Sequence, residues 1–311
     1  MQYYRQERLN YPYSLNKLYE SIGISKQAVH KQTQVYNRQM EMTLNIERIV
    51  NEIREDHPTI GCRDIYYKLS PIGIGRDAFE RLCKESGLMV SDRKNYKRTT
   101  DSTGVIRFDN LISDLTLDRI NQVWQSDITF YEIDKRFYYL TFIVDSYSRM
   151  ILGYSVSNRL YTEQTTLPAL QMALNNRKDD DLSSLIFHSD GGGQYYAKQF
   201  LSITYKYGIR NSMCEYAWEN GKAERINGVI KNNYLKHRQI KNFEDLKQEV
   251  DRCVKLYNNE KPHIGLKRLT PKEFENKVVN KTTKQSGLQV NKNQKTNKNK
   301  LKNKLSLVNL I

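Results

Sequence analysis

The order of apolar runs between residues 122 and 260 constrains the fold more than any other feature of this sequence. Three closely spaced runs, rich in β-branched and aromatic residues, predict an antiparallel meander of strands: VWQSDITFYEI, FYYLTFIVDSYS and RMILGYSVSN. Helical and strand patterns then alternate: a helix at 162–175, a strand in LSSLIFHS, a helix in AKQFLSITYKYG, a strand in IRNSMC and two further helices. This order predicts an α/β fold with a mixed sheet.

The segment that starts at Ser14 has the pattern of a helix-turn-helix. Gly23 allows the turn, and Ser25 can cap a second helix. The second helix would present four polar side chains to a DNA groove or to phosphates: Lys26, Gln27, His30 and Lys31. An ordinary helical hairpin explains the same pattern, so DNA binding is one of two readings here.

Further helical patterns follow before the strands begin. A longer helix is expected around 42–53, ending near His57, and two short helices are expected at 63–69 and 76–84. The patterns divide the chain into five parts: a helix-turn-helix-like segment (1–40), a second helical region (41–90), a basic linker (91–117), an α/β region with C-terminal helices (118–276) and a basic, disordered tail (277–311).

The charge of the chain favours a polyanionic partner. The formal net charge is +15, and the segment 277–311 contributes nine lysines and no acidic residue. This tail is either a nonspecific DNA-binding arm or a solubilising extension. No apolar run approaches the roughly 18 residues that a membrane span needs, and the four cysteines form no CxxC pair. The sequence therefore predicts a protein of the reducing cytoplasm with no membrane partner.

Three carboxylates are placed where a fold of this kind could bring them together. Asp127 lies in a predicted strand, Asp190 follows a strand and precedes three glycines, and Glu224 lies in a predicted helix. At an effective dielectric constant near 20, each pair of such charges about 4 Å apart costs roughly 4 kcal/mol. A cluster of this kind needs hard cations, and oxygen-only ligands suit Mg²⁺ or Mn²⁺. Asp145 also ends a strand, but we expect it to hold turn or backbone donors.

The helix that carries Glu224 has two distinct stripes. A buried stripe is expected from Ala223, Ile226, Ile230 and Tyr234. Glu224, Asn227 and Lys231 form a polar stripe at spacings of three and four residues, which could hold DNA phosphates. The candidate DNA contacts of this region are Lys222, Arg225, Asn227, Lys231 and Lys236. The alternative is a solvated helix face with an ordinary arrangement of charges.

Six short segments, in one order, carry a resemblance to a known family: WQSDITF, VDSYSRMILGY, HSDGGGQY, GIRNSM, AERINGVIKN and YNNEKPHIGLKRLTPKEF. They resemble the DDE catalytic core, with its ribonuclease H-like fold, of bacterial insertion-sequence transposases of the IS-three type (OrfB proteins), which are relatives of retroviral integrases. The resemblance covers roughly residues 118–276. The segments HPTIGCRDIYYKL and LCKESGL also resemble the helix-turn-helix that precedes the core in this family.

The resemblance implies roles for the three carboxylates. The family's metal-binding acids fall on Asp127, Asp190 and Glu224, and it implies two Mg²⁺ or Mn²⁺ ions that assist phosphoryl transfer. Water would first cleave a DNA strand at the element end, and the exposed 3′-hydroxyl would then attack target DNA. The 33 residues between Asp190 and Glu224 are about two fewer than the family's commonest spacing, a difference that falls in CEYAWENGK. Glu219 fits the family pattern less well than Glu224.

The expected activity is therefore metal-dependent DNA cleavage and strand transfer at the ends of an insertion sequence. Two alternatives stay open: a catalytically silent DNA-binding regulator or domesticated remnant, and a ribonuclease H-like nuclease without strand transfer. The implied partner is double-stranded DNA, both element ends and target. Pairing two ends implies a homo-oligomer on DNA, and the resemblance leaves open a frameshift fusion to a protein encoded upstream.

Overall fold

The computed structural model describes residues 14–90, 108–214 and 216–285, and the chain divides into two compact units. The first unit holds residues 14–52 and 69–89 of the described chain; the second holds 53–68 and the described residues from 108 onward. The linker and tail expected at 91–117 and 277–311 lie partly outside the described residues, as does the start of the segment 1–40.

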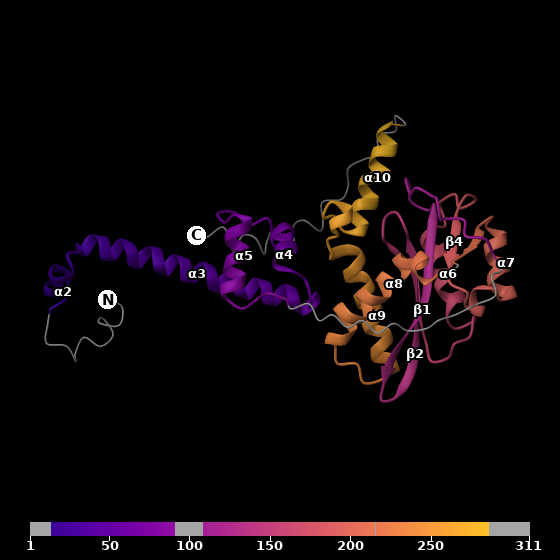
Figure 1. Ribbon diagram of the computed structural model, residues 1–311, viewed down its shortest axis with the longest axis horizontal. Helices are drawn as coiled ribbons and strands as arrows, with labels where there is room; N and C mark the ends of the chain where they lie inside the picture. Colours follow the sequence, from indigo (N-terminus) through magenta and orange to yellow (C-terminus); the bar gives the residue numbers. More distant parts are fainter. Residues whose placement is uncertain (1–13, 91–107, 215, 286–311) are drawn as a thin grey trace. The chain divides into compact units, whose positions relative to one another are not determined.

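The helix-turn-helix pattern of the first unit is built as the sequence predicts. Helix α2 (Leu15–Ile22) starts at Ser14, whose side chain accepts a hydrogen bond from the Lys17 amide, and ends at Gly23, which has a φ of 70°. The hydroxyl of Ser25 accepts a hydrogen bond of 3.1 Å from the Ala28 amide and so caps the next helix. The local turn geometry of a helix-turn-helix is therefore present (Figure 1).

That next helix is longer than the sequence pattern suggested. Helix α3 (Lys26–Asp56) is one helix of 31 residues and joins the two helices expected from Ser25 and around 42–53. No glycine or proline interrupts this stretch, so nothing breaks the hydrogen-bond ladder. The short helices α4 (Cys62–Leu69) and α5 (Arg76–Glu85) follow, as predicted, and α5 closes at Gly87.

A five-stranded mixed sheet forms the centre of the second unit. The strands are β1 (Val123–Ile133), β2 (Arg136–Asp145), β3 (Ile151–Ser157), β4 (Ile186–Ser189) and β5 (Arg210–Met213). Their order in the sheet is β3-β2-β1-β4-β5, in which the first three strands are antiparallel and β1, β4 and β5 are parallel. This arrangement confirms the predicted meander and the ribonuclease H-like α/β fold.

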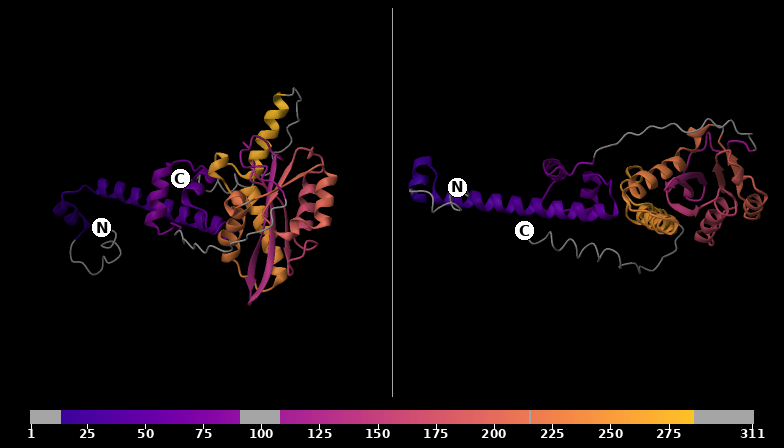
Figure 2. Two further views of the ribbon diagram at one scale, coloured as in Figure 1. Left: turned by 45° about the vertical axis from the view of Figure 1, so that its right-hand side comes forward. Right: turned by 90° about the horizontal axis from the view of Figure 1, so that it is seen from below.

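Helices cover both faces of the sheet, and each interface has its own apolar core (Figure 2). Helices α6 (Thr166–Asn176) and α7 (Lys198–Lys206) pack on one face. There Phe200 of α7 joins Trp124 and Phe187 of the sheet in one apolar cluster. Helix α6 begins four residues later than the predicted helix at 162–175. Helices α8 (Gly221–Gly228) and α9 (Phe243–Glu260) pack over Phe142 and Val144 on the other face.

The approach of α6 to the sheet depends on one glycine. A Cβ atom added to Gly153 in β3 would lie 2.0 Å from the Ala169 carbonyl oxygen and 2.8 Å from the Ala173 amide nitrogen. Both contacts are to backbone, which cannot move aside without displacing the helix. Only glycine therefore allows this spacing between α6 and β3.

The C-terminal part of the unit contains less regular helices. Helix α8 continues into a π-helix, η4 (Val229–Tyr234), and a short 3₁₀-helix, η5 (Leu235–His237). Helix α10 (Pro271–Gln285) starts with a capping box, in which Thr270 and Glu273 exchange hydrogen bonds of 3.1 Å. Its last residues belong to the segment expected as a tail. No helix in the described parts of the chain is long and apolar enough to cross a membrane.

Candidate active site

Asp127 and Asp190 are brought together by the register of the two central parallel strands. Ser126 of β1 pairs with Ser189 of β4, and each serine is followed directly by one of the two aspartates. Both carboxyl groups are half-buried. The charge of Asp190 raises the pKa of Asp127, which shows that the two groups are in electrostatic contact. The strands therefore place the two predicted acids at one point of the sheet.

The glycines after Asp190 allow the chain to turn tightly around its carboxylate. The Gly192 amide donates a hydrogen bond of 3.2 Å to Asp190 Oδ1, and the Tyr196 hydroxyl donates one of 2.9 Å to the Asp190 carbonyl oxygen. A Cβ atom on Gly192 would lie 3.1 Å from that Oδ1 atom. Burial raises the pKa of Asp190, and the bond from Gly192 opposes this shift. The sequence signal, a strand followed by glycines, thus describes a preformed carboxylate position.

Asp127 has the strongest functional signature of the three acids. Burial first, then the charges of Asp190 and Glu224, raise the pKa of Asp127 to about 7. Two hydrogen bonds, from the Ile128 backbone and from the Asn227 side chain, act in the opposite direction. The Asn227 amide donates to Asp127 Oδ2 at 2.8 Å. Perturbed carboxylates of this kind are concentrated at functional sites.

Asn227 does not lie where the sequence placed it. We expected this residue on a DNA-facing stripe, but its side chain is 5% exposed and points toward Asp127. Its Oδ1 atom is buried and has no hydrogen-bond partner among the described residues. Asn227 thus holds a carboxylate, a role that spacing along a helix does not reveal.

Glu224 lies in the first turn of α8 and is exposed. The predicted buried stripe beneath it is confirmed, since Ala223, Ile226, Ile230 and Tyr234 are all at most 4% exposed. Across the described residues, no three His, Cys, Asp or Glu side chains converge closely enough to hold a metal ion. Glu224 therefore acts on Asp127 through its charge from the rim of the site, as expected for acids that repel one another.

The donors that these residues offer fit a hard divalent cation. All three are carboxylates, without a thiolate or imidazole among them, which matches the ligand preference of Mg²⁺ and Mn²⁺. Burial raises the pKa of Asp127, and the negative charges of Asp190 and Glu224 raise it further, so negative charge accumulates at this point of the sheet. A cation between the carboxylates would offset that charge.

The predicted DNA-contacting residues have different surroundings. Lys222 Nζ donates to the Ser146 carbonyl oxygen at 2.7 Å, and Lys231 Nζ donates to Thr129 Oγ1 at 2.8 Å. Arg225 and Lys236 are exposed. In the first unit Lys26, Gln27, His30 and Lys31 are all exposed on α3. Both groups thus include side chains that a partner could reach.

Phe130 of β1 is an exposed aromatic residue beside the candidate site. Its side chain is 47% exposed and contacts Phe137 edge to face, while Lys231 Nζ lies 5.0 Å from its ring centroid. The pairing of β4 with β1 ends at Ser126, so the later part of β1 has no partner strand on that side. The sheet is therefore open beside the candidate site.

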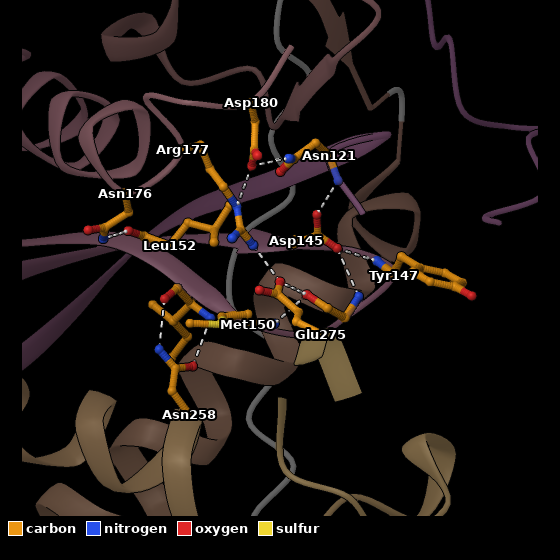
Figure 3. Close-up of polar contacts among 12 residues, drawn as sticks. Asn121, Asp145, Tyr147, Met150, Leu152, Asn176, Arg177, Asp180, Asn258 and Glu275 are labelled. Atoms are coloured by element: carbon orange, nitrogen blue, oxygen red, sulfur yellow. Dashed lines mark hydrogen bonds and ion pairs between the residues drawn. The ribbon is translucent and has the colours of Figure 1, made fainter. Parts of the chain in front are cut away.

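Asp145 has the structural role that the sequence analysis expected (Figure 3). Its Oδ1 atom accepts hydrogen bonds from the Tyr147 and Ser148 amides at 2.9 and 2.8 Å, and Oδ2 accepts one from the Asn121 amide at 2.6 Å. These bonds satisfy a fully buried carboxylate and fix the turn after β2.

Two other side chains that could be mistaken for site residues are also structural. Glu219 accepts a hydrogen bond of 3.0 Å from the Tyr216 amide at the start of a short helix. His188 is fully buried, with its Nδ1 atom 2.9 Å from the Ser212 hydroxyl. Neither side chain therefore combines burial with two neighbouring acids, as Asp127 does.

Several long-range contacts of the core were not predicted from the sequence. Glu275 of α10 is buried, forms an ion pair with Arg177 and accepts a 2.7 Å hydrogen bond from the Ser148 hydroxyl (Figure 3). Asn258 of α9 bonds both the amide and the carbonyl of Ile151, at 3.0 and 2.8 Å. More than a hundred residues separate Ser148 from Glu275 and Ile151 from Asn258, so no local pattern indicates these pairs.

Comparison with known proteins adds independent evidence. Two family models, both described as Integrase core domain, match residues 118–217 and 207–271. An insertion element IS600 protein of 31 kDa from Shigella sonnei is 30% identical over 242 residues, covering 74% of this chain and 88% of that protein. The putative transposase InsK of insertion sequence IS150 from Escherichia coli K12 is 26% identical over 246 residues, covering 75% and 84%.

Other matches come from a transposase and from a solved structure. The transposase InsF of insertion sequence IS3A from Escherichia coli K12 is 31% identical over 160 residues, covering 50% of this chain and 54% of that protein. The catalytic core domain of HTLV-2 integrase, solved in complex with magnesium, aligns at 21% identity with a TM-score of 0.39, covering 50% of this chain and 96% of that one. Motifs, sheet topology and sequence matches agree, and the chain belongs to the insertion-sequence transposases of the IS-three type, DDE polynucleotidyl transferases with an integrase core domain.

Proposed function

We propose that Asp127, Asp190 and Glu224 hold two divalent cations, Mg²⁺ or Mn²⁺, and that this site cleaves DNA at the ends of an insertion sequence and joins those ends to target DNA. The observation that carries the proposal is the register of β1 and β4, which places Asp127 and Asp190 next to each other, each directly after one of two paired serines. Burial, together with the charges of Asp190 and Glu224, raises the pKa of Asp127 to about 7, and a bound cation would offset this negative charge.

The chemistry of a bound cation here is that of a Lewis acid, which activates an attacking hydroxyl group and stabilises the charge on a leaving oxygen. Asp127 is central because it faces both of the other acids. Asn227 orients the Oδ2 atom of Asp127 through a hydrogen bond of 2.8 Å. The Gly192 and Tyr196 bonds fix the position of Asp190 on the opposite side. These contacts preorganise the two aspartates before any ligand binds.

The substrate of this chemistry is double-stranded DNA, both the element ends and the target, in the bacterial cytoplasm. Arg225, Lys231 and Lys236 supply positive charge around Glu224 and would bind the phosphate backbone. Joining two element ends to one target requires at least two active sites, so a homo-oligomer on DNA is the working form. A frameshift fusion to a protein encoded upstream would provide a further partner.

Oligonucleotides that carry the element ends test this proposal. With Mg²⁺, the wild-type protein should nick these duplexes and join them to a second duplex, and Asp190→Asn should lose more than a thousandfold in both reactions. Glu219→Gln is the matched control because Glu219 is the nearest alternative glutamate, and it should keep activity. Full activity of Asp190→Asn would refute the assignment. Nicking without joined product would instead identify a nuclease.

A further inference from the structure

A second group of charged side chains in the same unit has no place in the proposed catalytic step. Arg149 lies in the turn between β2 and β3, Arg225 in α8, and Lys261 directly after α9. His263 follows in the next loop. Lys261 and His263 belong to the segment YNNEKPHIGLKRLTPKEF, which carries part of the family resemblance. Three separate elements thus contribute cations to one part of the unit.

Close contacts fix the geometry of this group. The Arg149 guanidinium lies against the backbone of Gly265, since a Cβ atom there would come within 2.2 Å of Nη2 and 2.8 Å of Cζ. The His263 ring packs edge to face against Tyr257 at 4.9 Å, and the His263 amide donates a 3.1 Å hydrogen bond to the Leu269 carbonyl oxygen. The loop is therefore held in place beneath the arginine.

The charges of this group are not neutralised by the protein. In the described chain, the side chains of Arg149, Arg225 and Lys261 form no ion pair and no hydrogen bond. Burial lowers the pKa of Lys261, and the charge of Asp64, which is itself paired with Arg268, opposes this shift. Other cations of this region have partners, such as Lys68 with Glu260 at 3.0 Å. Arg149, Arg225 and Lys261 therefore have no directly paired carboxylate in the described chain.

The histidine among them carries no charge of its own. Burial, then Lys261, Arg149 and Arg225, lower the pKa of His263 to about 3. Arg149, Arg225 and Lys261 therefore all act electrostatically on the same imidazole. The His263 Nε2 atom is buried and has no hydrogen-bond partner among the described residues. Unpaired cations around an unsatisfied polar group are the setting of an anion site.

We propose that Arg149, Arg225 and Lys261 form a binding site for a phosphate group of the DNA backbone, outside the metal-binding acids. This inference rests on the proposed function for the identity of its ligand. Arg149 is suited to such a ligand because a guanidinium binds phosphate oxygens through two parallel hydrogen bonds. Arg225 and Lys261 add charge from the other side of the loop.

The position of the site relative to the catalytic acids supports a DNA ligand. In the β1–β2 register Asp127 faces Phe142, and Trp124 faces Asp145, so the turn that carries Arg149 begins three residues further along the sheet. At about 3.3 Å per residue this step is roughly 10 Å, or about three base pairs at 3.4 Å each. Arg225 follows Glu224 directly in the sequence. One duplex could therefore occupy both sites.

The salt dependence of DNA binding tests the proposal. The full-length protein is titrated, in EDTA, against a fluorescent 30-base-pair duplex at several potassium chloride concentrations. Loss of one phosphate contact should reduce the slope of log K against log salt by about 0.9. Arg149→Gln should show this reduction. Gly265→Ala should show it as well, because its methyl group displaces the guanidinium without changing the net charge.

Lys206→Gln is the matched control, since it removes one exposed lysine from α7 on the opposite face of the sheet. Its slope should equal that of the wild type. An unchanged slope in Gly265→Ala, with thermal unfolding showing a folded protein, would overturn the proposal even if Arg149→Gln weakens binding. Lys261→Gln provides the same test if Arg149→Gln fails to fold.

A competition experiment distinguishes a site for DNA phosphates from a site for free phosphate. At constant ionic strength, 20 mM sodium phosphate should weaken duplex binding of the wild type but not of Gly265→Ala. A site that binds inorganic phosphate while both variants keep the wild-type DNA slope would overturn the DNA assignment. The assay measures DNA binding without catalysis. Its result can therefore be interpreted even if the catalytic assignment is wrong.

Discussion

Asn227 of helix α8 donates a hydrogen bond to Asp127 of strand β1, with 2.8 Å between Nδ2 and Oδ2. The bond joins two residues that are a hundred positions apart and links the helix of Glu224 to the strand of Asp127. It lowers the pKa of Asp127 against the stronger effects of burial and of the neighbouring acids. Asn227 is therefore a positioning residue for the proposed metal site.

Asn227→Ala should raise the Mg²⁺ concentration needed for half-maximal DNA cleavage by about tenfold or more, because a hydrogen bond to a charged group contributes about 1.5–3 kcal/mol. Activity should partly recover at high Mg²⁺. Asn232→Ala, at an exposed position of the same helical stretch, is the control. An unchanged Mg²⁺ dependence of Asn227→Ala would contradict the positioning role.

Asp127→Asn should stabilise the metal-free protein above neutral pH. Because the folded state raises the pKa of Asp127 from 3.8 to about 7, the folded protein binds more protons than the unfolded chain between these values. Stability from this group therefore falls as the pH rises through that window. Urea unfolding in EDTA should show Asp127→Asn to be more stable than the wild type at pH 8, by at most about 4 kcal/mol, and nearly equal to it at pH 4. Asp179→Asn, at an exposed position, should show no such difference.

Glu260→Gln should lower the thermal stability of the protein at neutral pH and have no effect on it in acid. Hydrogen bonding to His57, together with Lys68, lowers the pKa of Glu260 from 4.5 to about 2. A carboxyl group whose pKa is lowered by folding stabilises the folded state at pH values above its pKa in the unfolded chain. This stabilisation is lost as the pH falls from 4.5 to 2. The thermal midpoint of Glu260→Gln should lie below that of the wild type at pH 7 and converge with it toward pH 2.5. A constant difference would show that the effect comes from packing.

Gly153→Ala should destabilise the core by about 3 kcal/mol, because the added methyl group would overlap with the Ala169 carbonyl and force α6 away from β3. Chemical unfolding measures this loss. Gly61→Ala is the matched substitution, since nothing lies within 4 Å of a Cβ atom there. Equal stability of the two variants would show that α6 does not pack closely against Gly153 of β3.

The parts of the fold that depend on local chemistry could be predicted from the sequence. Ser25 caps α3 and Thr270 pairs with Glu273 because a capping interaction needs only neighbouring residues. The meander and the strand before Asp190 were recognisable from β-branched runs and from glycine. These signals placed two of the three acids on the correct elements.

The features that escaped prediction depend on distant partners. Asn227 turns inward because Asp127 lies across from it, and Phe130 is exposed because β4 ends before reaching it. Glu275 is buried through Arg177 and Ser148, both contributed by other elements. Helical spacing and hydrophobicity describe one element at a time, so neither could indicate which polar side chain would find a buried partner.

The register between β1 and β4 also defines where the gene could gain or lose codons. Ser126 pairs with Ser189, and side chains alternate between the two faces of a sheet. Deleting one codon within either strand would turn an aspartate toward the opposite face. Between β5 and α8 the chain is held to β1 by hydrogen bonds such as that of 2.8 Å from the Asn220 side chain to the Ser126 carbonyl oxygen. The single step from each serine to its aspartate is therefore the spacing that most directly controls where the two carboxylates lie.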